Sequence, residues 1–171
     1  ILDNKPVFLG ISEILKISTE NTKQVLLLEL QIKLKELEEK WQLLTLERIF
    51  IENRIYRQIE EIESWEEVLN VIHRELLPYE GDLIRKIVHA DLIQLTEIKI
   101  KKITRYDLDR EKEKIHAVED LIKDTKYHIN HLVDYAVNYF KNIKKEHGIG
   151  QFRKTDIKIF DKIVASKVAI A

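Results

Sequence analysis

Two stretches of the chain carry hydrophobic residues at alternating intervals of three and four positions. The first stretch is mainly leucine, and isoleucine is the most frequent residue of the second. This spacing averages 3.5 residues, which keeps one apolar stripe facing one partner along a supercoiled helix. We call the two stripes together the seam; it comprises Leu27, Leu30, Leu34, Leu37, Trp41 and Leu44, and Ile115, Val118, Ile122, Thr125, Ile129, Leu132, Ala136, Tyr139 and Ile143.

The long segment between the two halves of the seam has to reverse the direction of the chain. Two long helices that meet along one stripe and are joined in this way run antiparallel. At about 1.5 Å per residue, a helix over residues 111–147 reaches about 55 Å. The pattern therefore predicts an all-α fold: a long antiparallel two-helix coiled coil, the stem, with a small helical globular tip at its far end.

Polar residues set the expected ends of the outgoing long helix and the start of the first tip helix. Ser12 is a suitable N-cap for a helix that begins at Glu13, and the helical pattern continues to about Glu63. Ser64 and Glu67 then have the spacing of a capping box. A shorter tip helix is therefore expected to begin directly after Ser64.

Further along the chain, turn-forming and capping residues divide the rest of the tip from the returning helix. Pro78 and Gly81 are expected to end the first tip helix, and Asp91 to cap another one. The returning helix is expected to follow a turn at Thr104–Asp109 and to stop at Gly148. The candidates for burial in the second tip helix are Leu92, Leu95, Ile98 and Ile103.

Two short segments near the termini have the patterns of strands. Val7–Leu9 is apolar and bounded by a proline and a glycine, and Thr155–Phe160 alternates apolar and polar residues. An antiparallel stem would bring both segments to its base. The expected organisation is residues 1–63 for the lead-in and outgoing helix, 64–110 for the tip, 111–147 for the returning helix, and 148–171 for a basic linker toward a further C-terminal domain.

Composition supports an elongated helical protein and narrows its chemistry. Charged residues make up 35% of the 171 residues, with only four Gly and two Pro, and the net charge is −1. Charge is uneven, because Lys141–Ala171 holds eight basic and three acidic residues. The absence of Cys excludes disulfides and thiolate metal sites and fits a reducing cytoplasm. There is no apolar run of membrane-spanning length and no signal peptide, and the start at Ile1 suggests a piece of a longer protein.

Few residues in the sequence suggest a catalytic or metal site. His128 and His131 are three positions apart on one helical face, but two histidines without a clear third ligand favour ordinary surface residues. Thr96 and Ser166 have no nucleophile motif around them, and no phosphate-binding loop is present. The basic pair that begins at Arg153 fits either a contact with a phosphate backbone or a solvated linker. Trp41 and Trp65 are interpreted as packing residues.

Four segments, taken in order, resemble one known family. Leu95–Thr104, followed by a charged long helix, looks like the exit-gate segment of the A subunits of bacterial type IIA DNA topoisomerases, gyrase and topoisomerase IV. Arg153–Ile157 is similar to the family's Arg-Arg-Thr-Glu-Ile after the returning helix, and Lys5–Leu15 resembles the lead into the outgoing helix. Glu47–Tyr56 looks closest to topoisomerase IV-like subunits. The resemblance covers nearly the whole chain.

This resemblance implies the role of a homodimeric C-gate. In the family, two coiled-coil arms project from the DNA cleavage core, their tips meet, and the transported duplex leaves when the tips part. The tip contacts expected here lie on Leu83, Ile84, Leu92, Leu95, Ile98, Lys99, Lys102 and Tyr106. Replacement of Leu95 by Glu is then expected to give monomers.

The resemblance also implies what the chain lacks. The cleavage tyrosine of the family stands upstream in an Arg-Tyr-Thr context, whereas Tyr106 here lies in Arg-Tyr-Asp at the gate turn, so we assign it a structural role. No cofactor or metal is expected in this segment, since ATP and Mg²⁺ belong to the partner B subunit. The expected partners of the full enzyme are this B subunit and duplex DNA. The full enzyme would be cytoplasmic and associated with the nucleoid, with no membrane partner.

Two other functions remain open from the sequence alone. A free-standing coiled-coil adaptor would dock another helical protein and would exist as a monomer or pair along its stem. A nucleic-acid binder acting through the basic C-terminal residues would bind DNA with strong salt dependence.

Overall fold

The computed structural model of the chain describes residues 6–99, 103 and 106–151. The all-α prediction is confirmed, and no strand occurs among the described residues. Val7–Leu9 is irregular, so its expected strand is wrong, whereas Thr155–Phe160 lies outside the described residues. The elements are α1 Ile11–Glu52, α2 Ile55–Gln58, α3 Trp65–Leu76, the 3₁₀ helix η1 Leu77–Asp82, α4 His89–Thr96, α6 Leu108–Asn130 and α7 Leu132–His147.

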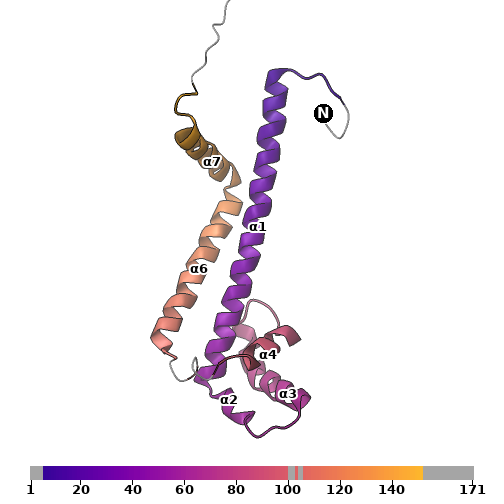
Figure 1. The fold of residues 1–171 in the computed structure, drawn as a ribbon, viewed down its shortest axis with the longest axis vertical. Coiled ribbons are helices and arrows are strands. Elements are labelled where there is room, and N and C mark those ends of the chain that lie inside the picture. The colour runs from indigo at the N-terminus through magenta and orange to yellow at the C-terminus, as the bar shows by residue number, and fades with distance from the viewer. Residues whose placement is uncertain (1–5, 100–102, 104–105, 152–171) are drawn as a thin grey trace, which may run out of the picture.

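The stem consists of α1 and the antiparallel helix α6, which pack along most of their length (Figure 1). α1 has 42 residues and is therefore about 63 Å long. Polar contacts also join α1 to α6. The Trp41 indole N–H donates to the Glu119 carboxylate over 2.9 Å, and the Lys126 ammonium lies 2.8 Å from the Glu38 carboxylate. Apolar burial supplies most of the stem's stability, because exposed ion pairs contribute less than about 1 kcal/mol each.

The seam residues are buried or half-buried, as predicted, as far along the chain as Ala136. Leu30, Ile115, Val118, Ile122, Thr125 and Ala136 are buried, and Leu27, Leu34, Leu37, Trp41, Leu44, Ile129 and Leu132 are half-buried. Leu26, one position before the expected Leu27, is the buried residue at that level of α1.

The returning helix is interrupted at His131, where the sequence predicts a continuous helix. His131 has φ −118° and ψ 44°, outside the helical region, and it ends α6 and precedes α7. Beyond this break α7 diverges from α1 (Figure 1). The last two expected members of the seam, Tyr139 and Ile143, are consequently 39% and 38% exposed.

Both ends of α1 differ from expectation. The helix begins at Ile11, because Gly10 is its N-cap and the Glu13 carboxylate accepts from the Gly10 backbone N–H over 3.1 Å; Ser12 lies inside the helix. It ends at Glu52 rather than near Glu63. Arg54 follows with φ 55°, a left-handed conformation that a helix cannot continue through and that costs roughly 1 kcal/mol.

The other helix ends test individual capping predictions. Ser64 is the N-cap residue of α3 as expected, but its side chain makes no capping hydrogen bond. α4 begins before Asp91, with Val88 at its N-cap, so the expected cap is wrong. α6 begins at Leu108, and the Asp107 carboxylate accepts from the backbone N–H groups of Asp109 and Arg110; Thr104 and Arg105 of the expected turn lie outside the described residues. Gly148 ends α7, as predicted.

Candidate protein interface at the tip

The globular end of the stem, which we call the tip, has a hydrophobic core of its own. It comprises the last turns of α1, then α2, α3, η1 and α4 (Figure 1), and Ile98, Ile103 and Tyr106 pack against its core. α1 contributes a continuous part of this core, so the tip extends further back along α1 than residue 64. The buried core residues are Leu46, Ile49, Phe50, Ile51, Ile55, Val68, Leu69, Ile72, Leu76, Leu92 and Leu95.

A buried glutamine fixes the loop between η1 and α4 to the long helix. Gln42 is 0% exposed, and its side-chain amide donates to the Arg85 carbonyl over 3.0 Å. The same amide accepts from the Ile84 backbone N–H over 3.2 Å. A buried amide without partners costs about 1–3 kcal/mol, whereas this one is satisfied on both sides. Gln42 therefore positions the Ile84–Arg85 backbone against α1.

The Arg85 guanidinium makes a second set of contacts between this loop and α1; we call Gln42 and Arg85, with their hydrogen bonds, the clamp. It donates to both oxygens of the buried Asp91 carboxylate over 2.7 and 2.9 Å, and to both oxygens of the exposed Glu39 carboxylate over 2.6 and 3.2 Å. Planar guanidinium groups suit such two-pronged contacts. Arg85 thus joins α1 to α4, and these hydrogen bonds raise the pKa of its own guanidinium above the usual value.

The charge of Asp91 depends on these contacts. Burial by itself raises the pKa of the Asp91 carboxyl, but hydrogen bonds from Arg85 and from the Val88 backbone N–H outweigh burial and lower the pKa below its ordinary value. Asp91 is therefore ionised at neutral pH. It acts as the third residue of α4, accepting from the N-cap backbone, rather than as the cap itself.

Several large apolar side chains on the tip stand in solvent. Ile84 is 46% exposed, next to the Gln42–Arg85 clamp, and Trp65 is 56% exposed, so the interpretation of Trp65 as a packing residue is wrong. Leu77 and Val88 are also exposed. A shallow hollow of about 370 Å³ next to Val88 is lined by Glu66, Leu69, Asn70, His73, Ile87, Val88, His89 and Leu92. These exposed apolar side chains are the candidates for contact with another protein surface.

The residues expected to form the dimer contact fall into two groups. Leu92 and Leu95 lie inside the tip's own core at 6% and 1% exposure, so neither side chain is available to a second copy in this conformation. Lys102 lies outside the described residues. The others differ in exposure: Leu83, Ile98 and Tyr106 are half-buried against the core, while Ile84 and Lys99 are more accessible. The dimer contact stays a prediction, with Ile84 its most accessible apolar member.

Tyr106 closes the core near the start of α6. Burial raises the pKa of its phenol to about 12, and the nearby carboxylates of Glu111 and Glu47 act in the same direction. The phenol is therefore protonated throughout the physiological range, which makes it a poor nucleophile. This agrees with the structural role assigned to Tyr106 from the sequence.

The two candidate histidine ligands are engaged with their own helix. The His131 ring stacks on the Tyr127 ring with centroids 4.1 Å apart, and its Nδ1 lies 2.9 Å from the Tyr127 carbonyl oxygen. His128 Nδ1 lies 3.5 Å from the Asp124 carboxylate. Within the described parts of the chain, no group of three His, Cys, Asp or Glu side chains is arranged to hold a metal ion. No helix there is long and apolar enough to cross a membrane.

Comparison with known proteins finds a similarity that extends over most of the chain. The chain is 27% identical over 164 residues to the A subunit of DNA topoisomerase 4 from Borreliella burgdorferi. The match covers 96% of this chain and 26% of that protein, so the chain spans about a quarter of the length of this relative. No model of a known protein family matches the chain. No solved structure matches it either.

Proposed function

We propose that the chain is the C-gate segment of the A subunit of a type IIA DNA topoisomerase. The observation that carries the proposal is a separately packed tip at the end of a long two-helix stem, in a chain similar over 96% of its length to the A subunit of a DNA topoisomerase 4. Two copies would meet through their tips and enclose a space between their stems. Separation of the tips would release the transported duplex.

The packing of the tip suits a joint that closes and opens repeatedly. The core of the tip is complete within one chain, so a tip that leaves its partner keeps its own buried leucines and isoleucines. Only the exposed apolar residues around Ile84 and Val88 would be covered by a second copy. A small interface of this kind gives reversible association, whereas obligate interfaces resemble a divided core.

The chemistry of strand passage would belong to other parts of the assembly. DNA cleavage, ATP hydrolysis and Mg²⁺ binding are proposed for the upstream A-subunit domains and for the partner B subunit, with duplex DNA as the shared substrate. Tyr106, half-buried and with its pKa raised to about 12, is suited to packing rather than to attack on a phosphodiester. We therefore expect this segment by itself to be inactive.

Replacement of Ile84 by Glu is expected to weaken self-association by at least tenfold. The change places a carboxylate at an exposed apolar position of the tip without disturbing the core, since Ile84 is 46% exposed. Loss of one apolar contact and burial of a charge in the dimer together cost more than about 1.4 kcal/mol, which is a factor of ten in the dissociation constant. Sedimentation equilibrium over a range of concentrations measures the effect.

The matched control for this experiment is Leu28→Glu on the outer face of the stem, where the side chain is also exposed. A tip-joined dimer should be unaffected by Leu28→Glu and weakened by Ile84→Glu. The reverse result would favour the adaptor function, in which the exposed Val25, Leu28 and Ile32 of α1 dock another helix. A monomer at all concentrations in both variants and in the unchanged chain would count against the gate.

A further inference from the structure

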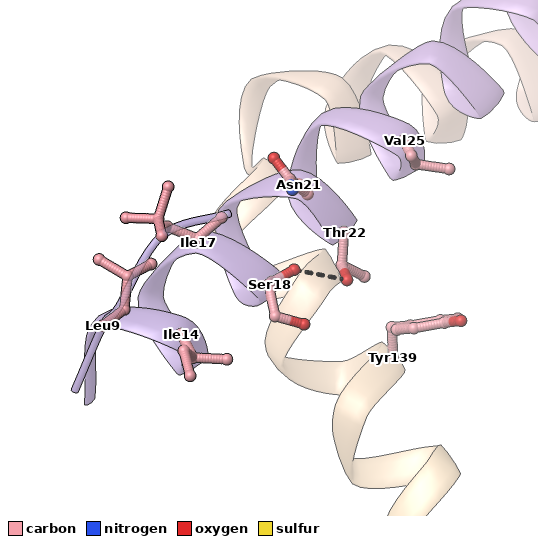
Figure 2. A pocket seen from close by; sticks show the side chains of 9 residues that line it. Leu9, Ile14, Ile17, Ser18, Asn21, Thr22, Val25 and Tyr139 are labelled. Carbon is pink, nitrogen blue, oxygen red and sulfur yellow. Dashed lines mark hydrogen bonds between the residues drawn. The ribbon is translucent and has the colours of Figure 1, made fainter. Parts of the chain in front are cut away.

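An apolar groove at the base of the stem is lined by residues of both α1 and α7. It has a volume of about 630 Å³, and its lining includes Ile14, Ser18 and Val25 of α1 and Tyr139 of α7 (Figure 2). α7 keeps a contact with α1 through the buried Ala136 and diverges from it further along (Figure 1). The groove therefore lies where the returning helix departs from the outgoing one.

The hydrophobic pattern of the returning helix does not end at this departure. From Ile129 the seam continues through Leu132, Ala136, Tyr139 and Ile143, at intervals of three and four residues. A helix without a break would keep all five on one face. Tyr139 and Ile143 are nevertheless 39% and 38% exposed. The chain thus carries two apolar side chains that suit a packed returning helix, whereas this conformation covers them only in part.

The break between α6 and α7 coincides with contacts of the His131 ring. Its Nδ1 lies 2.9 Å from the Tyr127 carbonyl oxygen and must donate, since a carbonyl oxygen only accepts. The same oxygen accepts from the His131 backbone N–H over 3.0 Å, and the Tyr127 and His131 rings stack with centroids 4.1 Å apart. A side chain that enters the ladder of helical hydrogen bonds is a known cause of kinks, and residues 108–147 contain no glycine or proline.

We propose that His131 is a hinge with two conformations: the open one described here, and a closed one in which α6 and α7 form a single continuous helix. In the closed conformation Tyr139 and Ile143 pack against α1 and fill the groove. The contacts of the His131 ring with Tyr127 favour the open conformation, and burial of the two apolar side chains favours the closed one. The hinge thereby changes the distance between α1 and the end of α7. This inference concerns a single chain and does not depend on the proposed gate.

The distance between two spin labels in the full chain tests the hinge, because the chain has no cysteine of its own. The labels are placed at Lys16→Cys on α1 and Lys145→Cys on α7, both exposed positions near the base. An excess of unlabelled chain keeps the measured distances within one copy. His131→Ala removes the ring and is expected to raise the ratio of short to long distances about tenfold, equivalent to about 1.4 kcal/mol. Unchanged distances in His131→Ala would overturn the proposal.

Asn130→Ala is the matched control. It replaces a neighbouring exposed residue of similar helix propensity by alanine but leaves the His131 ring in place. It should change the ratio by less than about threefold. An equal shift in Asn130→Ala and His131→Ala would mean that helix propensity, and not the ring, sets the break, and would contradict the hinge.

A double variant tests what closes the hinge. Ile143→Asp added to His131→Ala should return the distances to those of the unchanged chain, because an aspartate side chain is not buried against α1 without a partner. Short distances that persist in the double variant would contradict the packing of Ile143. A reference pair across the stem, Lys40→Cys on α1 and Lys123→Cys on α6, should keep one distance in every variant. A change there would mean that the whole stem moves, which would also overturn the hinge.

Discussion

Replacement of Phe50 by Ala is expected to destabilise the tip by about 3–5 kcal/mol, a large effect for a single truncation. The Phe50 side chain is 2% exposed in the tip core, and its ring lies 6.4 Å from the ring of Tyr56. Removing it leaves a cavity that the surrounding helices cannot fill without moving. Urea unfolding, followed by circular dichroism and by hydrogen exchange in α3, measures the loss.

Phe8 provides a control of the same chemistry, because its side chain is fully exposed near the base. Phe8→Ala should change the free energy of unfolding by less than about 0.5 kcal/mol. Similar effects for Phe50→Ala and Phe8→Ala would show that the tip core does not hold the tip together. Faster exchange confined to α3 and α4 in Phe50→Ala would show that the stem survives when the tip opens.

Arg85→Ala is expected to cost about 3 kcal/mol at pH 7, because it leaves the Asp91 carboxylate buried without its charged partner. The Val88 N–H still donates to Asp91, but one backbone hydrogen bond does not replace the guanidinium. Glu39→Gln removes only the exposed partner and should cost less than about 1 kcal/mol. Urea unfolding of both variants at the same pH gives the comparison.

The cost of Arg85→Ala should fall as the pH is lowered. In the unchanged chain the folded-state pKa of Asp91 is depressed, so its contribution is present above the unfolded-state pKa and is lost as the pH falls through the folded value. Without Arg85, burial dominates and raises the folded-state pKa of Asp91. Protonation of Asp91 then removes the cost of burying an unpaired carboxylate in the variant. The difference between the two proteins is therefore largest near pH 7 and smaller at acidic pH, below about 4. A difference independent of pH would contradict the assigned role of this pair.

The stem was predictable because its hydrophobic period is long and regular. Many positions agree on one face, so the sequence predicts two long helices and their contact without knowledge of any partner. Their ends are less predictable because caps depend on local geometry. Gly10 and Asp107 cap the starts of α1 and α6, while Arg54 ends the outgoing helix region by adopting a left-handed conformation that its residue type does not signal.

The break at His131 could not be found from the apolar pattern. No glycine or proline marks it, and the seam spacing continues through Leu132, Ala136 and Tyr139. Near the base, α1 also carries exposed apolar side chains at Ile14, Val25 and Leu28, so apolar spacing alone does not show where the returning helix leaves α1.

The tip shows what composition alone cannot distinguish. Leu92 and Leu95 were correctly expected to be buried, but the sequence does not tell whether an apolar side chain packs within its own chain or against another. The structure places both in the tip core, so loss of dimer in Leu95→Glu would not separate a disrupted contact from an unfolded tip. Ile84 avoids this ambiguity because it is exposed.

The polar clamp of the tip is the feature that sequence reasoning missed. Gln42 stands among apolar residues, and its burial becomes evident only when the Ile84–Arg85 backbone is placed beside it. Arg85 and Asp91 are six residues apart, which is not a helical spacing for an ion pair. A charged residue at the third position of α4 was the one available signal, and it indicated a cap instead.

The central claim is that two copies associate through their tips. Distances between spin labels at the tips and at the bases of the two copies test it most directly. The chain has no cysteine, so Lys86→Cys at the tip and Ser12→Cys at the base each provide one exposed labelling site. A dimer formed through the tips predicts a short, well-defined distance between the two labels at position 86. It predicts a longer distance between the labels at position 12, since α1 separates the two ends of the stem by about 63 Å. Close labels at position 12 with distant labels at position 86, or close labels at both positions, would contradict it.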